Sequence, residues 1–412
     1  MQHAQSRAGL RRWMGRGSLV ALAGLAVFGV SPALPALAAS WSSPVGLPGP
    51  CGSSVTVNQA GAMAAGGTFT ASNGTTQVEV CTSTNGTTWQ ATDLGPGGYP
   101  LTSGRGIVVV VTPAGQTVAL WGYESSSTGS TVLEAAVRPA GGRWGAPVTL
   151  STGLAGGLVL GVDGSGNVIA GWVGSGDDVT DVVLPAGSSS WGPATTLSTE
   201  FDQGVAHDIS MAVCPDGGAI IMFNGGLNNL WAISGTVTGG FSAPVEVASG
   251  AGSHSYIQSG TSQVALNNAG QASVAWSVLD GQTGLLTRSP SGTWTDTVVT
   301  TRTAPAVPVS TAIDGAGNAI AVFGSSYSWH LAGGSWQTAA ALPSGSSGGL
   351  AVADPAGTFV YANTAGDAFT FGAGATSFGA GSGSLGSLAD LKIVPGHAVL
   401  LAADAVSTEP VS

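Results

Sequence analysis

The side chains best suited to chemistry gather in one short stretch, Glu200-Phe201-Asp202 followed by His207-Asp208. Carboxylates are ligands that Ca²⁺ prefers and they also accept hydrogen bonds from sugar hydroxyls, while Phe201 offers a face on which a sugar ring stacks. These five residues are our first candidates for a ligand site. The competing interpretation, which we favour, is a solvated acidic loop, because no metal-ligand spacing such as that of an EF-hand accompanies them.

Three further residues complete the candidate ligand site: Asp177, Asp178 and Tyr256. Other polar residues in comparable stretches are Tyr99, Glu124, His254 and Asp280. The sequence contains no H-x-x-x-H or C-x-x-C spacing, no phosphate-binding loop and no nucleophile elbow. We therefore predict no catalytic residue, no metal ligand and no cofactor.

The secondary structure that positions these residues can be predicted from a repeated sequence phrase. The phrase consists of an apolar strand, a turn that ends in glycine and a second apolar strand. The turn glycines are Gly61, Gly115, Gly166, Gly217, Gly270, Gly317 and Gly357, spaced 54, 51, 51, 53, 47 and 40 residues apart. Six residues beyond five of these glycines stands an aromatic residue: Trp121, Trp172, Phe223, Trp276 and Phe323. Periods of this size are typical of propellers and repeat arrays.

A second phrase places an aromatic residue after another glycine turn, as in Gly142-Arg143-Trp144 and Gly334-Ser335-Trp336. Each repeat thus holds four short strands, which we call a to d from the inside outward. One such sheet exposes two apolar faces, and stacking sheets around an axis buries both. The sequence predicts an all-β β-propeller of four-stranded antiparallel blades, seven in number with eight as the alternative. A strand at 41–47 would complete the last copy at 388–406 and close the ring.

The lengths of the connections predict which face of the propeller carries function. The a–b and c–d turns are short and uniform, whereas the b–c and d–a connections are longer, vary between copies and hold the candidate residues. The fixed offset of the aromatics indicates packing between blades, and Asp163 and Asp314 are predicted to cap their own turns.

The first 39 residues are predicted to be a signal peptide, with cleavage near Ala38-Ala39, and residues 40–412 a single propeller domain. Arginines precede a short apolar run and an A-x-A site. Removal of the predicted signal peptide leaves six basic and 21 acidic residues, which give a net charge of −15. Lys392 is the only lysine. We expect a secreted protein with no nucleic-acid partner and no membrane span.

Three cysteines remain after the leader: Cys51, Cys81 and Cys214. An oxidising compartment permits one bridge and leaves one thiol. Cys51 and Cys81 are nearest in sequence, but the predicted strand register puts them at opposite ends of one blade, which argues against pairing.

One c–d turn, 83–89 (Ser-Thr-Asn-Gly-Thr-Thr-Trp), resembles the Asp-box of bacterial neuraminidase repeats, with Asn for Asp and one residue fewer. Residues 41–406 resemble secreted bacterial β-propeller repeat proteins with degenerate Asp-box turns. The resemblance implies the fold and a stabilising role for this turn. Sialidase chemistry would need three clamping arginines, and only Arg105 and Arg302 fall in candidate loops.

We predict a monomeric binding or interaction module for an extracellular carbohydrate or a cell-surface partner, because the architecture is complete while no catalytic set is. The alternatives are a sialidase-like or other carbohydrate-active enzyme, and a structural surface protein without a small ligand.

Overall fold

The computed structural model describes residues 41–97, 106–125, 128–198, 209–225, 229–249, 257–278, 283–300, 308–343, 348–372, 375, 377–379, 381, 387–395, 397–402 and 405–410. All described residues belong to one compact unit, 36–412. The predicted signal peptide therefore lies outside the described residues.

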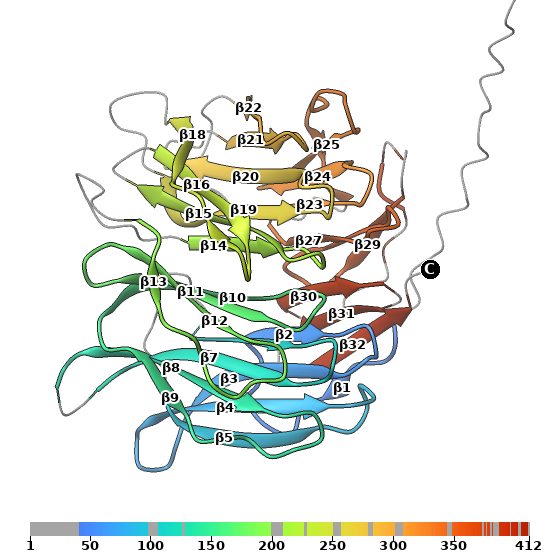
Figure 1. Cartoon of the computed structure of the whole chain (residues 1–412). Helices are drawn as coiled ribbons and strands as arrows, with labels where there is room; N and C mark the ends of the chain where they lie inside the picture. The colour runs from blue at the N-terminus through green and yellow to red at the C-terminus, as the bar shows by residue number, and fades with distance from the viewer. Residues whose placement is uncertain are drawn as a thin grey trace, which may run out of the picture. The chain divides into compact units, whose positions relative to one another are not determined.

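Eight antiparallel sheets follow one another along the chain, each formed from consecutive strands except the last (Figure 1). Blade 1 contains β2 (Ser54–Val57), β3 (Met63–Thr70), β4 (Thr76–Ser83) and β5 (Gln90–Pro96). Blade 2 contains β6 (Ile107–Val111), β7 (Thr117–Glu124), β8 (Thr131–Arg138) and β9 (Val148–Ser151). Blade 3 contains β10 (Leu154–Val162), β11 (Val168–Gly174), β12 (Val179–Leu184) and β13 (Thr195–Thr196). Blade 4 contains β14 (Ile209–Val213), β15 (Gly218–Gly225), β16 (Asn229–Thr236), β17 (Gly240–Phe241) and β18 (Val245–Ser249).

The second half of the chain repeats this pattern. Blade 5 contains β19 (Ile257–Leu266), β20 (Ala272–Val278), β21 (Thr283–Arg288) and β22 (Trp294–Thr300). Blade 6 contains β23 (Val309–Ile313), β24 (Ala319–Phe323), β25 (Ser326–His330) and β26 (Ala340–Ala341). Blade 7 contains β27 (Leu350–Ala353), β28 (Phe359–Ala362) and β29 (Ala368–Phe371). Blade 8 contains β30 (Leu388–Val394), β31 (His397–Ala402), β32 (Ala405–Pro410) and the N-terminal β1 (Val45–Gly46).

The two ends of the described chain close the ring, as predicted. Strand β1 pairs antiparallel with β32, Val45 opposite Val406, so the first strand lies beside the last (Figure 1). Just before β1, the Ser42 N–H donates to the Thr408 carbonyl at 2.8 Å. The split copy is thus a complete blade, and the blade count is eight, the alternative that the sequence left open, and not seven.

The five periodic aromatics occupy equivalent places in five blades, which confirms the repeat register. Each stands on strand b opposite the residue four positions before the end of strand a, as in Ile107↔Trp121, Ile209↔Phe223 and Val309↔Phe323. All five side chains are at most 3 % exposed. Trp276, for example, packs against Met222 and Leu230 of the preceding blade. The apolar core therefore lies between blades, as the fixed spacing predicted.

The a–b turns form a belt of hydrogen bonds on one face of the propeller. The Asp314 carboxylate accepts the N–H groups of Ala316 and Asn318 at 2.9 and 2.8 Å, and the Asp163 carboxylate accepts the Asn167 N–H at 2.8 Å. Both residues therefore cap their own turns, as predicted. Neighbouring turns are also bonded to each other, since the Asn267 side chain donates to the Asp314 carbonyl at 2.9 Å. These contacts make this face structural.

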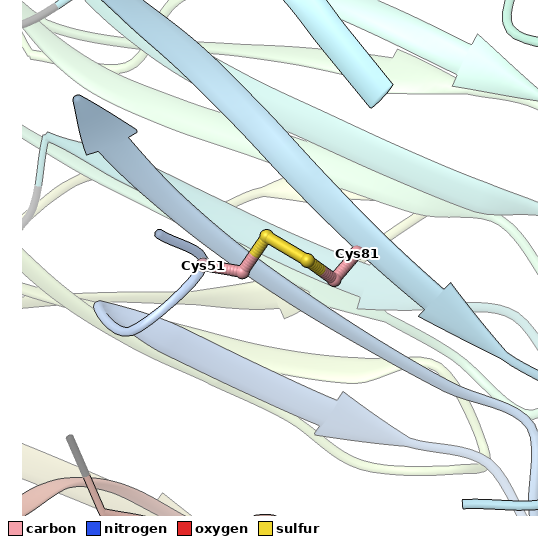
Figure 2. The surroundings of a disulfide bond; sticks show 2 residues. All are labelled: Cys51 and Cys81. Atoms are coloured by element: carbon pink, nitrogen blue, oxygen red, sulfur yellow. A yellow bond between two sulfur atoms is a disulfide. The ribbon is translucent and has the colours of Figure 1, made fainter. Parts of the chain in front are cut away.

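Cys51 and Cys81 form a disulfide, so the sequence argument against this bridge was wrong (Figure 2). The segment before β2 does not continue the line of that strand but folds back across β3 at Gly67. A side chain at Gly67 would collide with the Pro50 carbonyl and the Cys51 backbone, so glycine is required there. The crossing brings the Cα atoms of the two cysteines to 6.0 Å, while Cys214 is a buried free thiol.

Candidate functional site

The predicted ligand site is only partly within the described residues. Asp177 and Asp178 are described. The other six candidates lie outside the described residues: Glu200, Phe201, Asp202, His207, Asp208 and Tyr256. Arg105 and Arg302, the two arginines considered for a carboxylate clamp, also lie outside.

Asp177 and Asp178 form the hairpin between β11 and β12. Asp177 has a φ of 61°, the left-handed conformation that Asp tolerates better than most residues. The turn is closed by hydrogen bonds from the Asp177 N–H to the Gly174 carbonyl and from the Gly174 N–H to the Asp178 carbonyl, at 3.0 and 2.9 Å. Within the described part of the chain, no third His, Cys, Asp or Glu joins them to make a metal-binding group. Their backbone conformation shapes the turn.

Arg138 and Arg288 occupy the same structural slot in blades 2 and 5. Each is the last residue of strand c and pairs with the first residue of strand b, Thr117 and Ala272 respectively. The Arg288 guanidinium donates to the Gly270 carbonyl of the a–b turn at 2.6 Å. This arginine therefore supports a turn on the structural face.

A cavity of about 600 Å³ follows the axis of the propeller. The inner strands of all eight blades line it: β2, β6, β10, β14, β19, β23, β27 and β30. Each inner strand has a partner on one side only, so its other edge presents backbone N–H and C=O groups toward the axis. Valine and leucine side chains and a few uncharged polar ones, such as Thr56 and Gln263, complete the wall.

Asp390 and Lys392 are the only charged residues of the described cavity wall, and both belong to β30. The Lys392 side chain is 45 % exposed, whereas that of Asp390 is 1 % exposed. The ammonium nitrogen lies 3.6 Å from Asp390 Oδ1. The described wall of the cavity thus has one charged position, at the seam where blade 8 meets blade 1.

Asp390 joins the two blades of this seam. Its Oδ2 accepts the N–H of Val55 in β2 at 2.9 Å, and its Oδ1 accepts the Leu391 N–H at 3.0 Å. A carboxylate that accepts backbone N–H groups satisfies donors that the inner edges of the strands would otherwise leave unpaired. Asp390 therefore links blade 8 to blade 1 and stabilises the closed ring.

Sequence reasoning directed attention to the loops and named no candidate residue on the inner strands that line this cavity. The signal available in the sequence was the isolation of Lys392 on an inner strand, the one lysine of the chain.

A smaller groove of about 380 Å³ lies at the outer rim between blades 2 and 3. Strand β9 forms one wall, and the segment around Trp191 forms the other. The Trp191 ring packs against Val137 of blade 2 and Leu184 of blade 3, so its main role is to join the two blades.

No protein-family profile and no curated protein matches this sequence. Solved structures are similar in fold. BamB from Moraxella catarrhalis shares 13 % identity with a TM-score of 0.54, over 90 % of this chain and all of that one. The BP39L lectin from Burkholderia pseudomallei shares 14 % identity with a TM-score of 0.53, over 79 % of this chain and 98 % of the lectin. Sqt1 from Saccharomyces cerevisiae shares 12 % identity with a TM-score of 0.54, over 91 % of this chain and all of Sqt1.

Because the sequence identities are this low, the similarity between the structures shows a common fold alone. The chain is an eight-bladed β-propeller with a cavity along its axis, a class in which many unrelated functions occur.

Proposed function

We propose that this chain is a secreted, monomeric binding module that takes up part of an extracellular carbohydrate or cell-surface partner in its axial cavity. The single observation that carries the proposal is the cavity of about 600 Å³ that the inner strands of all eight blades enclose. Concave sites that combine apolar side chains with a few placed polar groups are where proteins usually bind small ligands.

Two further observations support binding over catalysis. The only charged pair of the described cavity wall is Lys392 with Asp390, and Asp390 is engaged with backbone N–H groups. Glycoside hydrolysis normally needs two carboxylates at a defined separation. One solved structure of similar fold is a lectin. Secretion rests on the predicted leader 1–39. The loop candidates remain proposed ligand contacts: Glu200, Phe201, Asp202, His207, Asp208 and Tyr256.

In the described residues, we find no helix with the length and apolar character needed to cross a membrane.

A bulky substitution in the cavity wall tests the proposal. Gln263 lies on β19, is partly exposed and lines the cavity. Gln263→Trp should reduce the available volume and weaken binding at least tenfold, measured on a glycan array and by calorimetry with any glycan that the array identifies.

Thr195→Trp is the matched control, because Thr195 is exposed on the outer strand β13, away from the axis. Both variants should unfold at temperatures close to that of the parent protein. Equal binding by both would contradict uptake in the cavity. A parallel screen with glycosidase substrates addresses the enzyme alternative, since turnover would overturn the binding-only reading. If the array showed no binding and the screen showed no turnover, the results would favour a structural surface protein.

A further inference from the structure

The position of the only lysine points to the chemistry of the ligand. A surface that needed positive charge for solubility would carry several lysines, but this chain of 412 residues has one, and its side chain lines the axial cavity. On β30, Asp390 and Lys392 point to the same side of the strand, toward β2 of blade 1, since Asp390 accepts the Val55 N–H there. The lysine therefore extends along the seam of the ring.

The ammonium of Lys392 is not saturated by its neighbour. Its distance of 3.6 Å from Asp390 Oδ1 is longer than the range of an N–H···O hydrogen bond. In the described part of the chain, this loose pair is the ammonium's only polar contact. An ammonium has three donors, so all three remain for water or a ligand.

We infer that Lys392 anchors a carboxylate of the ligand that enters the axial cavity. The inference rests on the proposed binding function and specifies its chemistry. A carboxylate beside Lys392 would gain charge-assisted hydrogen bonds, which are roughly twice as strong as hydrogen bonds between neutral groups. The remainder of the ligand would lie against the valine and leucine side chains and the backbone edges of the inner strands.

A monoanion fits this position better than a dianion. Asp390 already places one negative charge beside the ammonium. A phosphate dianion would add two more charges within a few ångströms of that buried carboxylate, and like charges at this range repel strongly. The net charge of −15 after loss of the leader acts mainly over longer distances, where salt screens it within a Debye length of about 8 Å.

Two sources supply such a carboxylate, a sugar acid and the C-terminus of a peptide. Because the chain has one lysine, reductive methylation with ¹³C-formaldehyde of the full-length secreted protein gives one side-chain NMR signal besides that of the N-terminus. Glucuronate and N-acetylglycine are the two probes, at millimolar concentration and constant ionic strength. The neutral amides of both, glucuronamide and N-acetylglycinamide, are the matched control ligands.

We expect the Lys392 signal to shift to saturation with at least one of the two acids and not with its amide. Saturation with glucuronate alone identifies a sugar acid, and with N-acetylglycine alone a peptide terminus. An unmoved signal with both acids, or equal shifts with acid and amide, would overturn the inference.

Variants give an independent test by ligand-observed NMR. Lys392→Met keeps the length of the side chain and should weaken carboxylate binding about tenfold to a hundredfold, the range for a hydrogen bond to a charged group. Lys392→Arg should stay within a few fold of the parent protein, because it retains the charge.

Asp390→Asn should bind the carboxylate more tightly, since it removes the neighbouring negative charge but keeps an acceptor for the Val55 N–H. Glycan binding that Gln263→Trp abolishes but Lys392→Met leaves unchanged would sink the carboxylate inference and leave the proposed function standing.

Discussion

Asp181 is a carboxylic acid in a buried environment. It lies on β12, opposite Gly171 of β11 and Thr195 of β13, and is only 6 % exposed. Its Oδ1 has no hydrogen-bond partner among the described residues. Burial raises the pKa of this carboxyl from 3.8 to about 6, because a charged carboxylate is poorly solvated there.

The raised pKa predicts how stability depends on pH. The folded state binds more protons than the unfolded state between about pH 4 and 6, so the contribution of Asp181 is most favourable below that window and is lost as the pH rises through the folded pKa of about 6. Asp181→Asn should therefore raise the free energy of unfolding by about 1–3 kcal/mol at pH 7.5 and by little at pH 4. Urea unfolding at both pH values measures this difference.

Glu246→Gln serves as the control for Asp181→Asn, because Glu246 is exposed on β18. It should leave the unfolding free energy unchanged at both pH values. If Asp181→Asn destabilised the protein equally at pH 4 and pH 7.5, the carboxyl would have an unrecognised favourable contact.

At the scale of the strands, a tryptophan and a glycine form a matched pair in blade 5. Trp276 of β20 stands opposite Gly284 of β21, and the Trp276 ring lies across the position that a Gly284 side chain would occupy. The φ of Gly284 is not in the left-handed region, so space alone requires the glycine. The aromatic side chain on strand b thus leaves space only for glycine at the opposite position of strand c.

A double-mutant cycle tests this pair. Trp276→Ala should cost about 3–5 kcal/mol of unfolding free energy through the cavity that it leaves between blades 4 and 5. Gly284→Ala should cost about 1–3 kcal/mol through overpacking. Combined with Trp276→Ala, Gly284→Ala should become neutral or stabilising, because the ring that it meets is gone. Additive losses in the two single variants and the double variant would show that the pair does not interact.

At the scale of the whole propeller, two devices hold the N-terminal segment in place. Strand β1 completes blade 8, and the Cys51–Cys81 disulfide binds the following segment to β4 of blade 1. The free cysteine, Cys214, has a pKa raised to about 12 by burial and by the Asp216 carboxylate, so its thiol is inert.

Loss of the disulfide should therefore destabilise the protein by about 2–4 kcal/mol. We expect the double variant Cys51→Ser with Cys81→Ser to unfold at a lower temperature than the parent protein, and to show no further change on reduction. Cys214→Ser should retain the decrease in unfolding temperature that reduction causes in the parent protein. If reductant left the unfolding temperature of the parent protein unchanged, this result would contradict a stabilising role for the disulfide.

The repeat, the four-stranded blades, the buried aromatics and the turn caps Asp163 and Asp314 could all be predicted from the amino-acid sequence. Each of these features depends on residues within about ten positions of one another or on a fixed spacing. Local patterns and fixed spacings can both be recognised in an amino-acid sequence. The closure by the N-terminal strand was also predictable, because the chain began with a lone outer strand and ended with an incomplete copy.

Only the tertiary structure decided the blade count of eight, the Cys51–Cys81 bridge and the axial cavity. The bridge depends on a segment that crosses a strand at Gly67, and the cavity on the backbone edges of strands contributed by every blade. The charged pair of the described cavity wall comes from one strand, but the place of that strand beside β2 exists only once the ring is closed. Contacts between residues such as Val55 and Asp390, 335 positions apart, arise from the closed ring and leave no local pattern in the chain.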